Sequence, residues 1–110
     1  MKKIKGVVIE GKKLGRRLGF PTANVQTEVE LEGGVYAGFV LLEGQKFKSA
    51  IFVWPDKKLL ETYIFDFSRS IYGQEIEVEI GDKIREVVKF ENQAQLVAQI
   101  KKDVALIAKN

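Results

Sequence analysis

The sequence predicts a mainly β fold, an antiparallel barrel or sandwich of five or six short strands followed by one C-terminal α-helix. Three observations lead to this prediction. Short segments alternate apolar and polar residues, glycine-containing turns separate several of them, and only the last part changes to helical spacing. A chain of 110 residues, 45% of them hydrophobic, can bury the core of one such domain, and no linker or repeat divides it. We therefore expect one domain over residues 1–110.

Each predicted strand combines alternation with flanking turn residues. The predicted strands are Lys5–Gly11, Gly34–Leu42, Lys46–Val53, Leu59–Phe67 and Gln74–Ile80. Turns are expected at Glu43-Gly44, Tyr72-Gly73 and Gly81-Asp82. Closure of these strands into a barrel would leave no exposed sheet edge.

The helix is predicted from Asn92 onward, with Asn92 as its N-cap. Its apolar residues recur at helical spacing: Leu96, Ile100, Val104 and Ile107. This stripe should pack on an end or a flank of the barrel.

Composition restricts the chemistry. The chain contains no cysteine and no histidine, so a disulfide framework, a thiolate nucleophile and an imidazole base are excluded. Any general base must be a carboxylate, a lysine or a tyrosine.

The longest apolar stretches, such as Ala37–Leu42, are too short to span a membrane, and the N-terminus lacks the apolar run of a signal peptide. We expect a soluble, cytoplasmic protein with no membrane partner.

Positive charge gathers near the N-terminus of a chain whose net charge is +3. Only Glu10 opposes the basic residues of the first 17 positions, which are Lys2, Lys3, Lys5, Lys12, Lys13, Arg16 and Arg17. A solvated basic face, a site for a phosphate-bearing ligand and a nucleic-acid site are all compatible with this pattern.

The segment 11–24 has the composition of a functional loop. Gly11, Gly15 and Gly19 allow backbone N–H groups to approach an anion, and Arg16 adds positive charge beside them. This suits the phosphates of a nucleotide, although an ordinary hairpin loop has the same composition.

Pro21-Thr22-Ala23-Asn24 adds oxygen donors to this loop. In an extended backbone, the hydroxyl of Thr22 and the amide oxygen of Asn24 point to one side, as a hard cation requires. The alternative is a Thr/Asn turn that satisfies its own backbone.

A dense motif runs through these residues: Gly6-x-Val8-x-x-Gly11-x-x-x-Gly15-Arg16-x-Leu18-Gly19-Phe20-Pro21-Thr22-Ala23-Asn24. Further blocks follow in order: Gly34-Val35-Tyr36-Ala37; Glu61-x-x-Ile64-Phe65-Asp66-Phe67 with Tyr72-Gly73; and Ile84-Arg85-x-x-x-Lys89-Phe90 leading to Leu96-x-x-Gln99-Ile100-x-x-Asp103. Together they span nearly the whole chain. They resemble the riboflavin kinase family, whose domain also forms the C-terminal half of bacterial bifunctional FAD synthetases.

The resemblance implies a six-stranded antiparallel Greek-key barrel with a C-terminal helix. It implies transfer of the γ-phosphoryl group of ATP to the ribityl 5′-hydroxyl of riboflavin, with Mg²⁺ or another divalent cation. We expect a monomer that binds no nucleic acid. Since no adenylyltransferase domain precedes the motif, the product should be FMN and not FAD.

The resemblance also implies site residues. Residues matching Thr22 and Asn24 hold the metal and the triphosphate, and a glutamate matching Glu61 is the catalytic base. Nucleotide binding is expected at Gly11, Gly15, Arg16, Thr22, Asn24 and Tyr72, and flavin binding at Ile84, Arg85 and Phe90.

Glu61 also fits the role of base on physical grounds. Alternation from Leu59 to Phe67 places its carboxylate on one face with Leu59, Tyr63, Phe65 and Phe67. Partial desolvation there would raise its pKa toward neutrality, whereas nearby Mg²⁺ would lower it. A surface glutamate is the alternative, and Asp66 is the next carboxylate to consider. We interpret Glu75, Glu77 and Glu79 as the solvated face of a strand.

One segment departs from the family pattern. At Ser49–Lys58 the usual glycine is missing, Trp54 is a bulky substitute, and the connection to Glu61 is short. The sequence therefore does not define the shape of the flavin or nucleotide pocket on that side, and Phe52 and Trp54 could belong to the core or stack on an aromatic ring.

Two other functions are compatible with the sequence: a flavin- or nucleotide-binding barrel without turnover, and a small nucleic-acid-binding barrel.

Overall fold

The computed structural model describes residues 2–9, 23–27, 30–55, 58–65, 67, 71–86 and 92–109, apart from the side chains of Gln93 and Leu96. The elements within these residues are β1 (Lys2–Ile9), β2 (Ala23–Gln26), β3 (Gly34–Leu42), β4 (Gln45–Trp54), β5 (Leu59–Ile64), β6 (Glu75–Arg85) and α2 (Gln93–Ala108).

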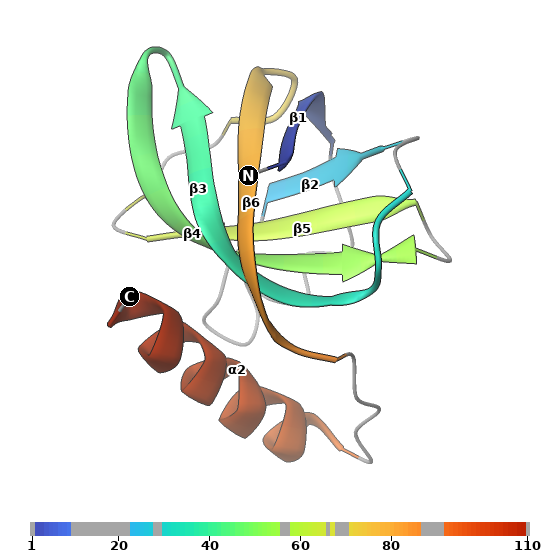
Figure 1. Ribbon diagram of the computed structural model, residues 1–110, viewed down its shortest axis with the longest axis vertical. Helices are drawn as coiled ribbons and strands as arrows, with labels where there is room; N and C mark the ends of the chain where they lie inside the picture. The colour runs from blue at the N-terminus through green and yellow to red at the C-terminus, as the bar shows by residue number, and fades with distance from the viewer. Residues whose placement is uncertain are drawn as a thin grey trace.

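The strands form a closed antiparallel barrel in the order β1-β2-β5-β4-β3-β6 (Figure 1). Strands β3, β4 and β5 are neighbours both in sequence and in space, and β6 returns to lie beside β3, which is the Greek-key arrangement. The predicted Greek-key barrel with a C-terminal helix is thus confirmed.

Two strand predictions were wrong. No strand was predicted at Ala23–Gln26, whose first two residues we placed in a loop, yet it forms β2 and joins β1 to β5. Gly81-Asp82 is not a turn, because β6 runs through it to Arg85. Tyr36 pairs with Lys83 and Gly38 with Ile80, so β6 carries an extra residue here and bulges. Gly38 permits this close approach, since a Cβ atom at this position would overlap the carbonyl oxygen of Glu79.

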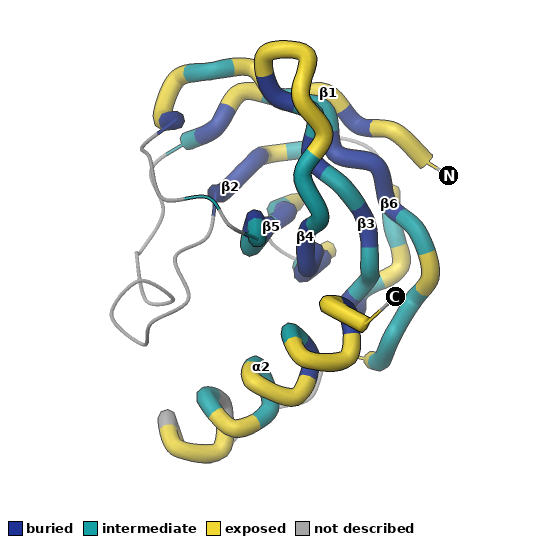
Figure 2. Tube along the Cα trace, turned by 90° about the vertical axis from the view of Figure 1, so that its left-hand side faces the viewer, coloured by how far each residue is buried: buried dark blue, intermediate teal, exposed yellow. Residues whose placement is uncertain are grey.

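Two hydrophobic clusters hold the molecule together. The larger one fills the barrel, and its fully buried side chains include Val25, Ile51 and Leu60. The smaller one lies between the outer face of the barrel and α2, where Ile107 packs with Val35, Ala50 and Phe52. Figure 2 shows buried residues along the strands and a largely exposed outer side of α2. The helix therefore covers a flank of the barrel.

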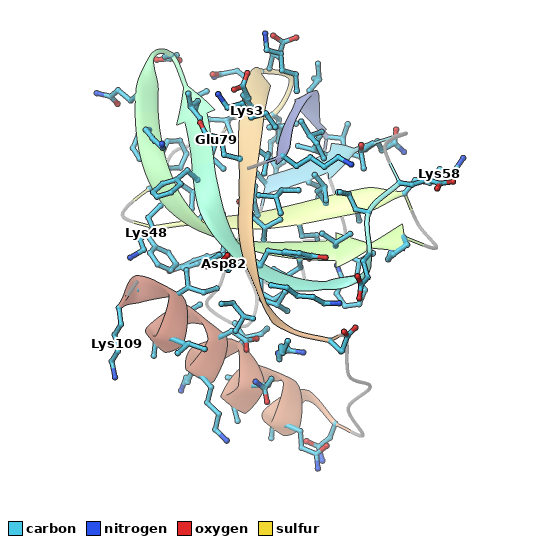
Figure 3. The ribbon with its side chains drawn as sticks, viewed as in Figure 1. Lys3, Lys48, Lys58, Glu79, Asp82 and Lys109 are labelled. Atoms are coloured by element: carbon cyan, nitrogen blue, oxygen red, sulfur yellow. The ribbon has the colours of Figure 1, made fainter. Side chains whose placement is uncertain are left out.

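Helix α2 begins as predicted. The side-chain oxygen of Asn92 accepts a hydrogen bond of 2.9 Å from the backbone N–H of Gln95, which is an N-cap. At the other end, the Lys48 ammonium group donates a hydrogen bond of 3.0 Å to the carbonyl of Ala108, and Figure 3 shows Lys48 beside this end of the helix. A cation suits the negative end of a helix dipole. No helix in the described part of the chain is long and apolar enough to cross a membrane.

The interpretation of the β6 glutamates as a solvated face was wrong for Glu79. Its carboxylate points outward from the barrel but is only 6% exposed. Lys46 lies 3.3 Å from it and also stacks over the ring of Phe39, while Lys3 is its cross-strand neighbour on β1 (Figure 3). Long side chains from adjacent strands thus cover a position that alternation alone assigns to solvent.

Candidate functional site

The barrel places two of the predicted site residues directly opposite each other. Asn24 of β2 and Glu61 of β5 are cross-strand partners. Their neighbours Val25 and Leu60 point into the barrel core, so Asn24 and Glu61 lie together on the outer face. Asn24 is 6% exposed and Glu61 is half-buried. The predicted metal ligand and the predicted base are therefore neighbours, although neither role follows from this position alone.

These two residues belong to a row that crosses the outer face of the sheet. In order around the barrel, the row consists of Ile9, Asn24, Glu61, Phe52, Val35 and Arg85. Phe52 and Val35 are buried beneath α2, whereas Ile9 lies on the opposite side of Asn24. Glu61 thus stands between a polar neighbour, Asn24, and an apolar neighbour, Phe52.

The prediction of which side chains share a strand face with Glu61 was correct in part. Leu59 and Tyr63 share its half-buried face, and Phe65 continues it with its ring 5.4 Å from that of Tyr63. Phe67 does not share it, because β5 ends at Ile64 and the alternation stops. The ring of Phe67 packs instead on Phe47 and the inner core.

Several predicted site residues lie outside the described residues. They are Gly11, Gly15, Arg16, Thr22 and Phe90, together with the alternative carboxylate Asp66. Their roles stay predictions.

Tyr72 lies on the Asn24 side of the row. It occupies a turn closed by a 3.0 Å hydrogen bond from Gln74 to Ile71, in which Gly73 has a φ of +81°. The turn pairs with β1 through hydrogen bonds to Val8, the residue before the cross-strand partner of Asn24. The predicted neighbour of the nucleotide base is thus fixed to the strand that adjoins the predicted metal ligand.

Ile84 and Arg85, the described members of the predicted flavin set, lie at the other end of the row. Ile84 packs against the outer cluster. The guanidinium group of Arg85 donates two hydrogen bonds to Asp103 of α2, of 2.9 and 2.7 Å, and Gln99 donates a third of 3.0 Å to the same carboxylate. Asp103 is 2% exposed. Asp103 belongs to the last block of the sequence motif, but no role was predicted for it, because the neighbouring residues in the sequence do not indicate that it is buried.

A pocket of about 380 Å³ opens where β2 and β4 end and β5 begins. It is lined by Thr27, Glu30, Leu31, Val53, Trp54, Pro55, Lys58 and Leu59. Trp54 and Leu59 are cross-strand partners on the outer face, one pleat away from the pair of Phe52 and Glu61, so the pocket adjoins the row. The segment Ser49–Lys58, which departs from the family pattern, thus contributes several of the residues that line this pocket.

A surface cluster adjoins Glu30 and Leu31, two of the residues that line the pocket. The ammonium group of Lys83 lies 2.5 Å from Glu32 and 2.6 Å from Glu86, and Tyr36 donates a hydrogen bond of 2.6 Å to the carbonyl of Glu32. The hydrogen bond to Glu32, followed by that to Glu86, raises the pKa of Lys83 to about 12. Burial raises the pKa of Tyr36. These contacts tie the end of β6 to the segment that carries Glu30 and Leu31.

The donor set is compatible with a divalent cation that also binds a triphosphate. Within the described ranges, no three acidic side chains cluster as a metal site. Asn24, beside Glu61, offers an oxygen donor of the kind that Mg²⁺ accepts. Since Mg²⁺ is commonly bound through one or two protein ligands plus substrate phosphates, so small a set fits.

Comparison with known proteins identifies the family. The family model for riboflavin kinase matches residues 2–110. The chain is 44% identical, over 96% of its length, to the RNA-binding riboflavin kinase RibR of Bacillus subtilis, and it covers 50% of that protein. It is 41% identical, over 93% of its length, to a bifunctional riboflavin kinase/FMN adenylyltransferase of Haemophilus influenzae, of which it covers 36%.

Solved structures share the fold. The crystal structure of a macrolide-efflux protein from Streptococcus pneumoniae matches with a TM-score of 0.83 and 32% identity, covering 96% of this chain and 36% of that one. A riboflavin kinase from Trypanosoma brucei matches with a TM-score of 0.70 and 23% identity, covering 97% and 77%, and supports the fold alone. The chain spans half or less of the curated relatives named above, yet the family model covers nearly all of it. The chain belongs to the riboflavin kinase family.

Proposed function

We propose that this chain phosphorylates riboflavin, using ATP and a divalent cation, to give FMN. The observation that carries the proposal is the direct pairing of Asn24 with Glu61 on the outer face of the barrel. Family membership supplies the substrate class, and the pairing supplies a base beside an oxygen donor for a metal-bound triphosphate.

In the proposed step, the carboxylate of Glu61 accepts the proton of the ribityl 5′-hydroxyl. The hydroxyl oxygen forms a bond to the γ-phosphorus of ATP, and the bond from that phosphorus to the bridging oxygen breaks, releasing ADP. Phosphoryl transfer requires mainly alignment and charge neutralisation, so few protein groups suffice. Asn24 and Thr22 would hold the cation, which neutralises charge on the phosphates when bound.

The order of residues in the row supports binding of the two substrates on opposite sides of Glu61. Tyr72 and Asn24 lie on one side of Glu61, and we place the nucleotide there. Phe52 lies on the other side, and the pocket lined by Trp54 and Leu59 is adjacent. An apolar pocket with a few polar groups suits a flat heteroaromatic ring, so we place the isoalloxazine of riboflavin against Trp54.

The two other functions have less support. A binding-only barrel would keep the pocket, but it has no need of a base beside Asn24. A nucleic-acid surface would need a basic stripe free of acidic neighbours, whereas Lys3 and Lys5 of β1 are exposed but lie opposite Glu79 and Glu77 of β6. We therefore propose a monomeric enzyme that acts on small molecules.

The test is incubation of the protein with riboflavin, Mg²⁺ and each nucleoside triphosphate in turn, with FMN separated by chromatography. FMN should form with ATP, and the Glu61→Gln variant should form far less. Absence of FMN with every triphosphate and divalent cation, together with retained riboflavin binding, would establish the binding-only function instead.

A further inference from the structure

The most deeply buried ion pair in the described part of the chain joins the end of β6 to α2. Asp103 is 2% exposed, and Arg85 meets it through two nearly parallel hydrogen bonds of 2.9 and 2.7 Å. Gln99, one helical turn earlier, donates to the same carboxylate. The guanidinium group also donates a 2.9 Å hydrogen bond to the carbonyl of Glu86. The side chain of Arg85 is thus held in one orientation by three bonds.

Stability alone does not account for such a pair. Burying two charges has a large desolvation cost, and well-packed apolar residues in their place are often equally stable. The helix already has an apolar contact nearby, because Ile107 is fully buried against Val35, Ala50 and Phe52. The ion pair fixes the orientation of the Arg85 side chain, because the planar guanidinium group binds a carboxylate in a defined geometry.

The position of Arg85 connects this geometry to the site. Along the row, Arg85 is three strand steps from Glu61 by way of Val35 and Phe52. At about 4.8 Å a step this is roughly 14 Å. Phe52 and Val35 are buried beneath α2, so the connection from Arg85 to Glu61 runs through packed side chains. Arg85 also lies on the side of Glu61 away from Asn24, where we place the acceptor.

We propose that Asp103 is a positioning residue for the acceptor substrate. It orients the guanidinium group of Arg85 and fixes the end of β6 relative to α2, and so it sets the acceptor side of the site without touching the substrate. This inference rests on the proposed function. Its consequence is that loss of the Asp103 carboxylate impairs the use of riboflavin and leaves the use of ATP unchanged.

The test compares Asp103→Asn with Leu42→Ala in the full chain. Asparagine keeps the size of the side chain but cannot give Arg85 two charged acceptors. Leu42 is buried in the inner core at the far end of β3, so its truncation lowers stability away from the site. For Asp103→Asn, kcat/KM for riboflavin should fall about 10- to 100-fold, as small misplacements of a substrate do, with the KM for ATP unchanged. Leu42→Ala should lower the melting temperature at least as much as Asp103→Asn does. It should leave the kinetic constants for riboflavin and for ATP unchanged.

The outcomes are distinguishable. If wild-type protein makes FMN and Asp103→Asn has normal riboflavin kinetics, or if both variants lose riboflavin use in proportion to stability, Asp103 is structural and the inference is overturned. If wild-type protein makes no FMN, the proposed function fails, and riboflavin affinity measured by flavin fluorescence replaces kcat/KM. Weaker riboflavin binding by Asp103→Asn alone would still support positioning, and equal or absent binding would refute it.

Discussion

Glu61 carries most of the proposed chemistry, and its surroundings explain why. Its β5 neighbours on the same face are Leu59 and Tyr63, and its cross-strand neighbours are Asn24 and Phe52. The predicted base is thus half-buried among these groups and lies one strand spacing from the predicted metal ligand.

Glu61→Gln should lower turnover by about 10² to 10⁴-fold, the usual contribution of a positioned base, with little change in the binding of riboflavin or nucleotide. Glutamine keeps the size of the side chain but cannot accept the proton. Glu77→Gln is the matched control, because Glu77 is a half-buried strand glutamate outside the row. A structural glutamate would show the reverse, a lowered melting temperature with a nearly normal rate, and Asp66 would then be the next candidate base.

Trp54 should contribute to riboflavin binding through its ring. Trp54→Leu keeps the pocket apolar but removes the flat surface, so the KM for riboflavin should rise about tenfold, as expected for loss of an aromatic pair and part of its buried area. Steady-state kinetics with each substrate varied in turn would measure this. An unchanged KM with a lowered melting temperature would assign Trp54 to the core, where it also contacts the outer cluster.

Lys83 gives a test of stability against pH. Its pKa is raised from 10.5 to about 12 by Glu32 and Glu86, so its contribution is fully present below pH 10.5 and is lost as the pH rises through about 12. Lys83→Met should therefore unfold at lower urea concentration than wild type at about pH 8, and the difference should narrow above pH 10.5 and close only above about pH 12. Lys101→Met, at an exposed helix position, is the control. A constant difference across this range would show that the ion pairs do not contribute.

Among the elements, the β3–β4 hairpin shows how turn chemistry and strand register agree. Leu42 pairs with Gln45, and the two residues between them both have positive φ, +51° at Glu43 and +79° at Gly44. This is the pattern of a type I′ turn, whose twist matches that of the strands. Glycine adopts it freely, whereas glutamate at the first position is strained.

Glu43→Asn should therefore stabilise the protein by about 0.5–1 kcal/mol, part of the cost of left-handed backbone for an ordinary residue. Urea unfolding would measure the shift in midpoint. Glu43→Ala separates this effect from the loss of the carboxylate, because alanine removes the charge but tolerates positive φ poorly. Equal gains in both variants would mean that charge, and not backbone conformation, is responsible.

For the molecule as a whole, the contact between barrel and α2 is narrow but specific. Asp103 and Ile107 are the buried helix positions among those described, and Lys48 holds the last turn. The outer cluster beneath the helix includes Phe52, the neighbour of Glu61. Helix position and site geometry are therefore linked through packed side chains.

Ile107→Ala should lower the free energy of unfolding by about 2–5 kcal/mol, because it removes a fully buried side chain and leaves a cavity at this contact. Leu106→Ala is the matched control one residue away. Leu106 is 50% exposed, so its truncation should change stability by no more than about 0.5 kcal/mol. Similar losses in the two variants would show that the helix does not pack as described.

Features with a local cause could be predicted from the sequence. Alternation identified Gly34–Leu42 residue for residue, and Asn92 indicated the start of the helix because an N-cap acts on the next turn. The spaced motif indicated the family, and it predicted Asn24 and Glu61 as site residues. The roles of Gly11, Gly15, Arg16, Thr22 and Phe90 stay predictions.

Other features depend on which distant strands become neighbours. The four residues of β2 are too few for a recognisable alternation, and they form a strand because β1 and β5 lie on either side. Glycine at position 81 predicts a turn locally, yet β6 bulges there and continues along β3. Closure of the barrel likewise buries Glu79 and pairs Asn24 with Glu61, and the packing of α2 on the barrel flank brings Asp103 to Arg85. Each of these contacts joins segments far apart in the chain, and periodicity, which reports a residue's own strand or helix, carries no information about register between them.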